Sequence, residues 1–385
     1  MDKKSFDLKD ICIEPKLTCS KPEQEGFKRY VGLEHIDSDS LKLSRWGSIA
    51  KDKPSFTRVF KKGHVLFGKR RPYLRKAAIA EFDGICSGDI IVLEANIDVV
   101  NSTLFPFLIH SDKVWSHAIK TSSGSLSPRT KFKDLGQVKF FLPNISDQKQ
   151  LADDLLALQK NRTLLEEQAK KTLQLESSLL QQTCGFLGKY NATDNLKERC
   201  PKDNKVVKLK DVLIKVSRPI KLQDEKVYRT VVARRSFGGV EERELIKGKN
   251  IKVKSQFEIS TGDFLISKRQ IVHGGCGVVP KELSGSVVSN EYDVFNTSEC
   301  LDMGFFSWLV QTPRLRNYFF INSVGIHIEK MLFKTEQWLN MPLILPSKAK
   351  QIEIAQALDE LKAFRQLQID KIKHIEKIKT YLLSD

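Results

Sequence analysis

Long apolar runs are absent from this sequence. No stretch approaches the roughly 18 apolar residues that a membrane-spanning helix needs. The first ten residues, MDKKSFDLKD, contain no apolar core of the kind that a signal peptide has. We therefore expect a cytoplasmic protein with no membrane segment.

Paired cysteines are also absent. The 7 cysteines are scattered and form no CxxC pair, which favours incidental thiols in a reducing compartment over a disulfide framework. His273 and Cys276 share one loop, but two ligands fall short of the four that a structural zinc site needs. We expect neither a metal nor a cofactor.

Catalytic motifs are missing as well. The chain has no Gly-rich cofactor loop after a strand and no Asn/Asp-Pro-Pro-aromatic sequence that could hold an exocyclic amine. Residues 185–189, GFLGK, are too short for a phosphate loop and lack a Ser or Thr after the lysine. Asp10, Glu14 and Lys16 resemble the acid and lysine set of a nuclease, but Pro15 lies where a strand should pair. We expect a non-catalytic protein, with any methyl transfer carried out by another chain.

Positive charge, in contrast, is plentiful. Lys and Arg number 64 against 47 Asp and Glu, a formal net charge of +17. This excess favours a polyanionic partner, although a generally basic surface would give the same count. The 385 residues are enough for two or three domains with separate cores.

The sequence contains a repeat about 200 residues long. The stretch GHVLFGKRRPY recurs as GDFLISKRQIV, and LPNISDQKQLADDLLALQK recurs as LPSKAKQIEIAQALDELKA. A period this long indicates duplicated domains, because solenoid repeats run about 20 to 50 residues. The first match places Gly63, Leu66, Lys69 and Arg70 against Gly262, Leu265, Lys268 and Arg269, and the second places Leu142, Pro143 and Gln148 against Leu345, Pro346 and Gln351.

The sequence pattern of each half predicts an α+β domain followed by a long helix. Short β-type runs separated by Gly and Pro surround one helical window, at 103–119 in the first half. Residues 148 to about 187 and 348 to 383 lack Pro, carry apolar residues at 3-4 spacing and predict two long helices. Each needs a partner for its apolar stripe, so we expect an intramolecular antiparallel coiled coil; two unrelated helices on separate domains are the alternative. The expected order is a first domain at 1–146, a long helix at 147–188, a linker at 189–205, a second domain at 206–346 and a long helix at 347–385.

Two basic loops form the main candidate site, because each directly follows the repeated apolar strand. Cations there can neutralise phosphates, an Arg can bind a guanine edge, and a Gln suits adenine. A single charge run is usually a solvated surface, but recurrence in both halves favours nucleic-acid binding. The candidates are Lys69, Arg70, Arg71, Tyr73 and Arg75 in the first half and Lys268, Arg269 and Gln270 in the second.

A second polar loop precedes the final strand of each half. Its Gly, Ser and Arg residues allow close approach to a phosphate backbone, although they also serve as plain loop formers. The candidates here are Ser123, Ser125, Arg129 and Lys131 in the first half and Asn322 and Ser323 in the second.

Taken in order, these features resemble the specificity subunit of type I restriction-modification enzymes. The duplicated Gly-Asp/His-x-Leu strand, the Ser-Gly-Ser loop before a Leu-Pro, and the Gln that opens each long helix (Gln148, Gln351) carry the resemblance over essentially the whole chain. His64 departs from the pattern, since Asp263 is the usual residue. The resemblance implies two target-recognition domains held apart by two antiparallel helices.

The resemblance also implies a function. Such a subunit is non-catalytic, reads a split sequence in double-stranded DNA, and recruits methyltransferase subunits, expected to be two, and restriction-translocase subunits. A two-headed scaffold that binds protein instead of DNA is the alternative from another class, and DNA binding with its salt dependence separates the two. A fused single-chain restriction enzyme would need room for a methyltransferase, which this chain lacks.

Overall fold

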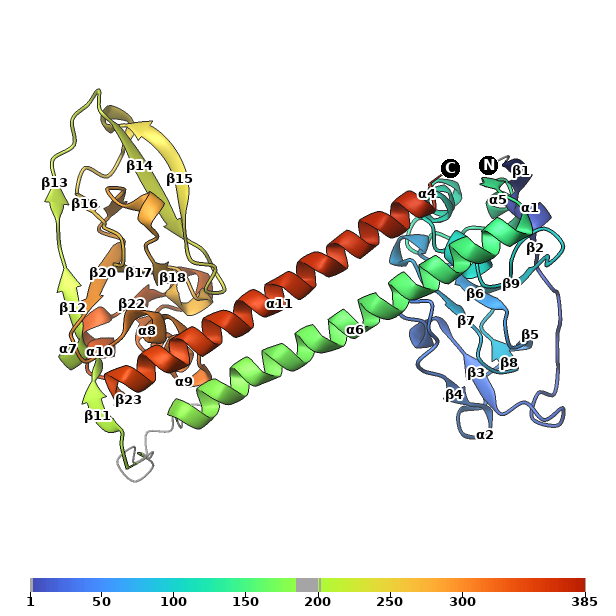
Figure 1. Cartoon of the computed structure of the whole chain (residues 1–385), viewed down its shortest axis with the longest axis horizontal. Coiled ribbons are helices and arrows are strands. Elements are labelled where there is room, and N and C mark those ends of the chain that lie inside the picture. The colour runs from blue at the N-terminus through green and yellow to red at the C-terminus, as the bar shows by residue number, and fades with distance from the viewer. Residues whose placement is uncertain (1–2, 185–199, 201, 385) are drawn as a thin grey trace. The chain divides into compact units, whose positions relative to one another are not determined.

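The computed structural model describes residues 3–184, 200 and 202–384. The chain divides into two compact units, one of residues 1–167 with 369–385 and one of residues 168–368. Each unit therefore contains an α+β domain together with part of both long helices (Figure 1). Within the described residues, no helix combines the length and the apolar character that crossing a membrane requires.

The first domain is built from two four-stranded sheets and a layer of helices. One sheet has the order β2 (Cys12–Ile13), β9 (Ile90–Ala95), β6 (Val65–Gly68), β7 (Ala77–Ile79). The other has the order β4 (Gly47–Ser48), β3 (Arg29–Val31), β8 (Gly84–Cys86), β5 (Arg58–Phe60), with β3 and β8 parallel. The α-helices are α1 (Leu8–Ile11), α2 (Ile49–Asp52), α3 (Phe105–Ile109), α4 (Asp112–Thr121) and α5 (Phe132–Leu135), and β1 (Lys4–Asp7) pairs antiparallel with β10 (Lys139–Leu142).

Strand β6 is apolar along its whole length because both of its faces are buried. Val65 and Phe67 face the helices, where the Phe67 ring stacks on Trp115 with centroids 4.5 Å apart. Leu66 lies on the opposite face in the core with the second sheet. Successive side chains of a strand point to opposite faces, so a sheet covered on both sides needs the continuous apolar run that the sequence shows.

The second domain repeats this arrangement. Its sheets have the orders β12 (Leu213–Val216), β20 (Tyr292–Thr297), β17 (Phe264–Ser267), β18 (Cys276–Val278), and β13 (Pro219–Ile220), β16 (Gln256–Glu258), β19 (Val287–Ser289), β14 (Val227–Ala233), β15 (Val240–Lys247). Phe264 and Ile266 again face the helices while Leu265 faces the other sheet. The expected α+β class and the tandem repeat are confirmed. The domain also contains α7 (Leu209–Val212), α8 (Met303–Leu309), α9 (Pro313–Ile321) and α10 (Thr335–Leu339). Strand β11 (Lys205–Lys208) pairs with β23 (Pro342–Leu345), and β21 (Ser323–Val324) pairs with β22 (Leu332–Phe333).

The two long helices, α6 (Ile145–Cys184) and α11 (Lys348–Leu382), run antiparallel. In the unit of residues 168–368, Gln368 donates to Gln168 at 3.3 Å, and Arg365 donates to Glu176 at 2.8 Å. The residue number rises along α6 as it falls along α11, as an antiparallel pair requires. In the other unit, Arg162 pairs with Glu376 at 3.1 Å. The expected antiparallel pair is confirmed, and the linker expected at 189–205 lies largely outside the described residues.

A buried glutamine fastens the start of each long helix to its domain. The Gln148 side chain accepts from the backbone N–H of Asn101 at 2.9 Å and donates to two carbonyl oxygens at 3.1 and 2.9 Å. Gln351 does the same with Asp302 at 2.8 Å and two carbonyls, both at 2.9 Å. Because a buried amide must have its hydrogen bonds satisfied, these three bonds fix the helix to the chain segment before it.

Candidate nucleic-acid interface

The first basic loop leaves β6 through a tightly held turn. The backbone N–H of Gly68 donates to Lys76 at 2.8 Å, and that of Lys69 donates to Asp89 at 3.0 Å. Between them, Arg71 and Arg75 both adopt left-handed φ angles, 52° and 49°. Non-glycine residues in this region are strained and often lie at functional sites. The turn raises the Arg71 and Tyr73 side chains into solvent.

The fold brings the second polar loop against the first. Ser123 and Arg129 exchange two backbone hydrogen bonds of 3.0 and 2.9 Å, which close the loop, and Arg129 also forms an isolated β-bridge with Arg70. The Arg71 N–H donates to Pro128 at 2.7 Å. Two loops that the sequence places about 60 residues apart therefore form one surface.

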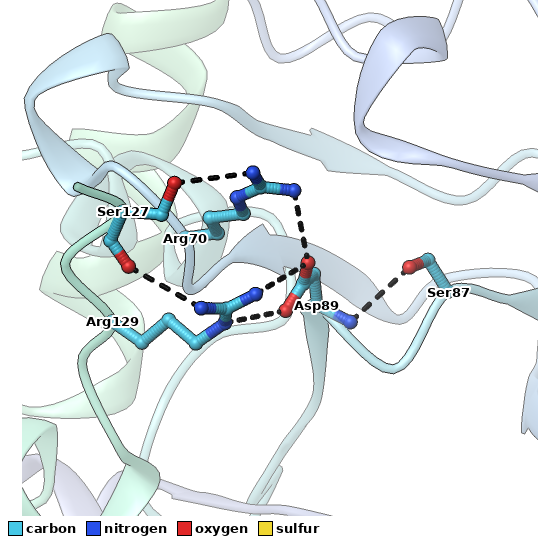
Figure 2. A network of polar contacts seen from close by, with 5 residues as sticks. All are labelled: Arg70, Ser87, Asp89, Ser127 and Arg129. Carbon is cyan, nitrogen blue, oxygen red and sulfur yellow. Dashed lines mark hydrogen bonds and ion pairs between the residues drawn. The ribbon is translucent and has the colours of Figure 1, made fainter. Parts of the chain in front are cut away.

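A carboxylate lies at the centre of this surface (Figure 2). Arg129 donates to both Asp89 oxygens, Nε at 2.8 Å and Nη2 at 3.3 Å, while Arg70 Nη1 lies 3.7 Å from Asp89. Ser127 joins the two guanidinium groups: its hydroxyl accepts from Arg70 at 3.1 Å and its carbonyl from Arg129 at 3.3 Å. The hydrogen bond from Arg129 holds the pKa of Asp89 below its ordinary value, so the carboxylate stays charged. Two cations fixed by one anion leave a net positive, pre-oriented surface.

Other predicted residues of the first domain surround this pair. Tyr73 is 53% exposed, and Ser125 and Lys131 are exposed. Arg71 forms no side-chain hydrogen bond or ion pair with any described residue. Arg75 is engaged, since it pairs with Asp39 at 2.7 Å and with Asp112 at 2.8 Å. Arg71 is thus the more available cation of the two.

The second domain has the same arrangement after β17. The Lys268 N–H donates to the backbone carbonyl of Glu291 at 2.9 Å, as that of Lys69 does to the carbonyl of Asp89. Arg269 then donates to the two Glu291 oxygens, Nε at 2.7 Å and Nη2 at 3.4 Å. In each domain a serine lies two residues before the acid, Ser87 or Ser289. Its hydroxyl accepts a hydrogen bond from the backbone N–H of the acidic residue. The cation and carboxylate pair is therefore part of the repeat.

Gln270, the third predicted residue of this loop, has a partner that lies far away in sequence. Its side-chain oxygen accepts from Arg235 Nε at 2.8 Å, and Arg235 Nη2 also donates to Glu329 at 2.6 Å. His273 Nε2 lies 3.3 Å from the other oxygen of Glu329. This network joins the basic loop to the turn between β14 and β15 and to the loop near 329.

Two predicted residues of the second domain are buried. Asn322 ends α9, where its side chain donates to Tyr318 at 2.8 Å, and the Ser323 hydroxyl donates to Phe319 at 2.7 Å. They are 6% and 7% exposed. Both side chains thus satisfy carbonyls at the end of a helix, and they are not part of the proposed interface.

Sequence reasoning missed three residues of the site, namely Asp89, Glu291 and Arg235. The two acids stand in the short runs SGD and SNE, 202 positions apart, which a search for Ser two residues before an acid would have found. Arg235 stands in ARRSFGG, a basic pair before a Gly-Gly turn. Among the described residues, no group of three or more His, Cys, Asp or Glu side chains could hold a metal ion.

Comparisons with known proteins show what the chain is similar to. Residues 1–175 match the family model described as "Type I restriction modification DNA specificity domain". The chain is 28% identical over 153 residues to the type I restriction enzyme EcoDI specificity subunit of Escherichia coli, a match that covers 40% of this chain and 34%, about a third, of that protein.

Solved structures share the fold over nearly the full length. One belongs to a study of complex assembly and conformational transition of the type I R-M system, with a TM-score of 0.58, 18% identity, and 99% of this chain and 96% of that chain covered. Another is the S subunit of a type I restriction-modification system from M. genitalium, with a TM-score of 0.57, 11% identity, and 100% and 95% covered. The family match thus covers residues 1–175, under half of the chain, and these solved structures are similar to the whole chain in fold alone.

Proposed function

We propose that this chain reads a bipartite target in double-stranded DNA, one half with each domain, as the recognition subunit of a type I restriction-modification complex. The observation that carries the proposal is the repeated pair of a basic loop and an acid, Arg70 and Arg129 with Asp89, and Arg269 with Glu291. Two equivalent sites in one chain are suited to a target in two parts.

The paired arginines suit base recognition better than simple charge neutralisation. An arginine held by a carboxylate loses less side-chain freedom on binding, and its planar group can contact the O6 and N7 of a guanine. The freer cations, such as Arg71 and Lys131, suit phosphate oxygens, which set register and affinity. Each domain would then combine sequence readout with backbone contacts.

Catalysis would belong to partner subunits. The family of the first half is a DNA specificity domain, and the sequence has no motif for binding a methyl donor or nucleotide. We propose that the chain binds methyltransferase subunits and restriction-translocase subunits and brings them to the site. Isolated full-length chain should then transfer no methyl group from S-adenosylmethionine.

The experiment is a titration of the full chain against labelled duplex DNA at several salt concentrations. We expect the logarithm of the affinity to fall linearly with the logarithm of salt, by about 0.9 for each phosphate contacted. Replacing Arg71 and Lys131 with Ala should lower this slope. A matched variant with Lys9 and Lys139 replaced removes the same charge from exposed positions elsewhere in the domain and should keep it. Absence of duplex binding at low salt would contradict the proposal and favour a protein-binding scaffold.

A further inference from the structure

The turn between β14 and β15 is a feature of the second domain alone. Its strands correspond to β3 and β4 of the first domain, because β14 lies parallel to β19 as β3 does to β8. In the first domain these strands are short and joined by residues 32–46, whereas β14 and β15 form a long hairpin that turns over residues 234–239. The hairpin turn is therefore a local addition to a shared frame.

The hairpin turn is strained and docked onto the basic loop. Ser236 and Phe237 both have left-handed φ angles, 58° and 57°. Their backbone N–H groups donate to His273 at 2.7 Å and to Gly274 at 3.0 Å. A Cβ atom on Gly274 would lie 2.9 Å from the Phe237 ring, so glycine is needed for this close approach. Such strain persists only where the surrounding structure enforces it, and it is typical of functional sites.

Docking places Arg235 beside Gln270. Arginine can only donate hydrogen bonds, so the Gln270 atom that faces Arg235 Nε at 2.8 Å is the side-chain oxygen. Glu329 accepts from Arg235 Nη2 at 2.6 Å and holds the other side of the guanidinium. The Arg235 side chain is still 52% exposed. Donors on Nη1, on Nη2 and on the Gln270 amide remain without partners among the described residues.

From this geometry we infer that Arg235 reads a guanine in the half-site of the second domain, with Gln270 and Glu329 as positioning residues. Guanine presents two acceptors, N7 and O6, in the major groove, and an edge made only of donors matches it. The inference rests on the proposed function and deepens it by naming the base. In the first domain the Asp39 N–H donates to Arg75 at 3.1 Å, as the Phe237 N–H does to Gly274 in the second. The residue two positions before Asp39, which matches Arg235, is Asp37, an acid that pairs with Arg45, so we place no guanine reader there.

The experiment compares duplexes selected from a randomised pool by the full-length chain and its variants. The wild type should select two half-sequences, and Arg235→Ala should lose the preference for one guanine in one half only. Arg234→Ala is the matched control, because Arg234 lies in the same turn but pairs with Glu241 at 2.6 Å across the hairpin. The Arg234→Ala variant should still select both half-sequences from the pool.

A second test leaves the protein unchanged. Replacing the selected guanine with 7-deazaguanine removes N7, and wild-type binding should weaken about tenfold, while Arg235→Ala should be indifferent. An unchanged motif with Arg235→Ala, together with full tolerance of 7-deazaguanine at each selected guanine, would overturn the inference alone. Selection of no motif by the wild type would overturn the proposed function as well.

Discussion

The two domains have nearly the same backbone frame but opposite charges at one point of the site. In both, the residue after the apolar strand donates its N–H to the backbone carbonyl of an acidic residue, Asp89 or Glu291, at 3.0 and 2.9 Å. In the first domain the second loop then contributes a cation, Arg129, to that acid. In the second domain the loop before the final strand contributes an acid, Glu329, to Arg235. A shared backbone that carries different charged loop residues in its two copies is suited to reading two different half-sequences.

A second difference lies below the surface, at the turn before the apolar strand. Asp263 is buried there, accepts the N–H of Ser260 at 2.7 Å, and pairs with Arg218 at 2.6 Å. His64 takes the same position in the first domain, where its Nδ1 accepts the N–H of Lys61 at 3.2 Å. A neutral imidazole thus replaces a carboxylate as the hydrogen-bond acceptor. The frame tolerates this change because it needs an acceptor and not a charge.

The largest effect on stability is expected at the two buried glutamines, and it shows whether they fasten the long helices to the two domains equally strongly. Replacing Gln148 or Gln351 with Ala leaves one N–H and two carbonyl oxygens without their partner, at about 1 kcal/mol or more each, so each variant should lose about 3 kcal/mol or more. Urea unfolding of the full chain measures this loss. Gln150→Ala, on the exposed face of α6, should change stability little. If only one of the two variants lost stability, the two domains would not be equivalent where the long helix begins.

Acid should destabilise the first domain more than the second. Burial lowers the pKa of His110 to about 4, and burial also lowers that of His64. The unfolded chain takes up protons below about pH 6.5 while the folded domain does not, so stability falls as pH falls from 6.5 towards 4. For His110 alone, the loss between pH 7.5 and pH 5 should be about 2 kcal/mol.

Hydrogen exchange resolved by peptide measures that effect in each domain separately. Ser111 and Thr312 are equivalent, because the hydroxyl of each donates to the carbonyl three residues earlier. The residue before each is His110 in the first domain and Gln311 in the second, so Gln311 is the counterpart of His110. His110→Gln removes the titrating group and keeps a donor for the Ala77 carbonyl. We expect it to flatten the pH dependence of the first domain. Equal acid sensitivity of both domains would contradict the assignment.

A smaller effect distinguishes the two turns after the apolar strands. Gly274 and Arg75 occupy matching left-handed positions, with φ angles of 79° and 49°. Gly274→Ala should cost about 1–3 kcal/mol, since it adds backbone strain and a Cβ atom against Phe237. Arg75→Gly should be nearly neutral, because relief of strain offsets the loss of two exposed ion pairs. Thermal unfolding of both variants is the measurement, and the reverse ranking would refute this reading of the turns.

The repeat made much of this fold predictable, because duplicated residues mark equivalent strands and helices. The apolar pattern at 103–119 predicts one helical window, whereas the structure has two helices there, α3 and α4, separated at His110 and Ser111. Both pieces bury most of their apolar residues in one core, so the spacing of those residues does not reveal the break. The polarity of Asn322 and Ser323 predicts exposed loop residues, and only the position of the end of α9 shows that they are buried.

The charged part of the site was predictable only in part. The basic loops follow directly from the sequence, but their partners Asp89 and Arg235 lie in turns elsewhere in the sequence, and tertiary pairing alone brings them to the loops. Arg71 and Arg75 look alike in sequence, yet Arg75 is neutralised by Asp39 and Asp112. Charge counts predict a partner class, whereas pairing decides which cations can reach it.

The central claim, that each basic loop reads its own half of the target, is tested most directly by one set of affinities. The full chain, the Arg70→Ala/Arg71→Ala variant and the Lys268→Ala/Arg269→Ala variant are each titrated with the selected duplex and with versions in which one half is scrambled. We expect one variant to lose discrimination, about 1–3 kcal/mol for a base contact, at one half and the other variant at the other half. Loss at the same half in both variants, or at neither, would contradict the account.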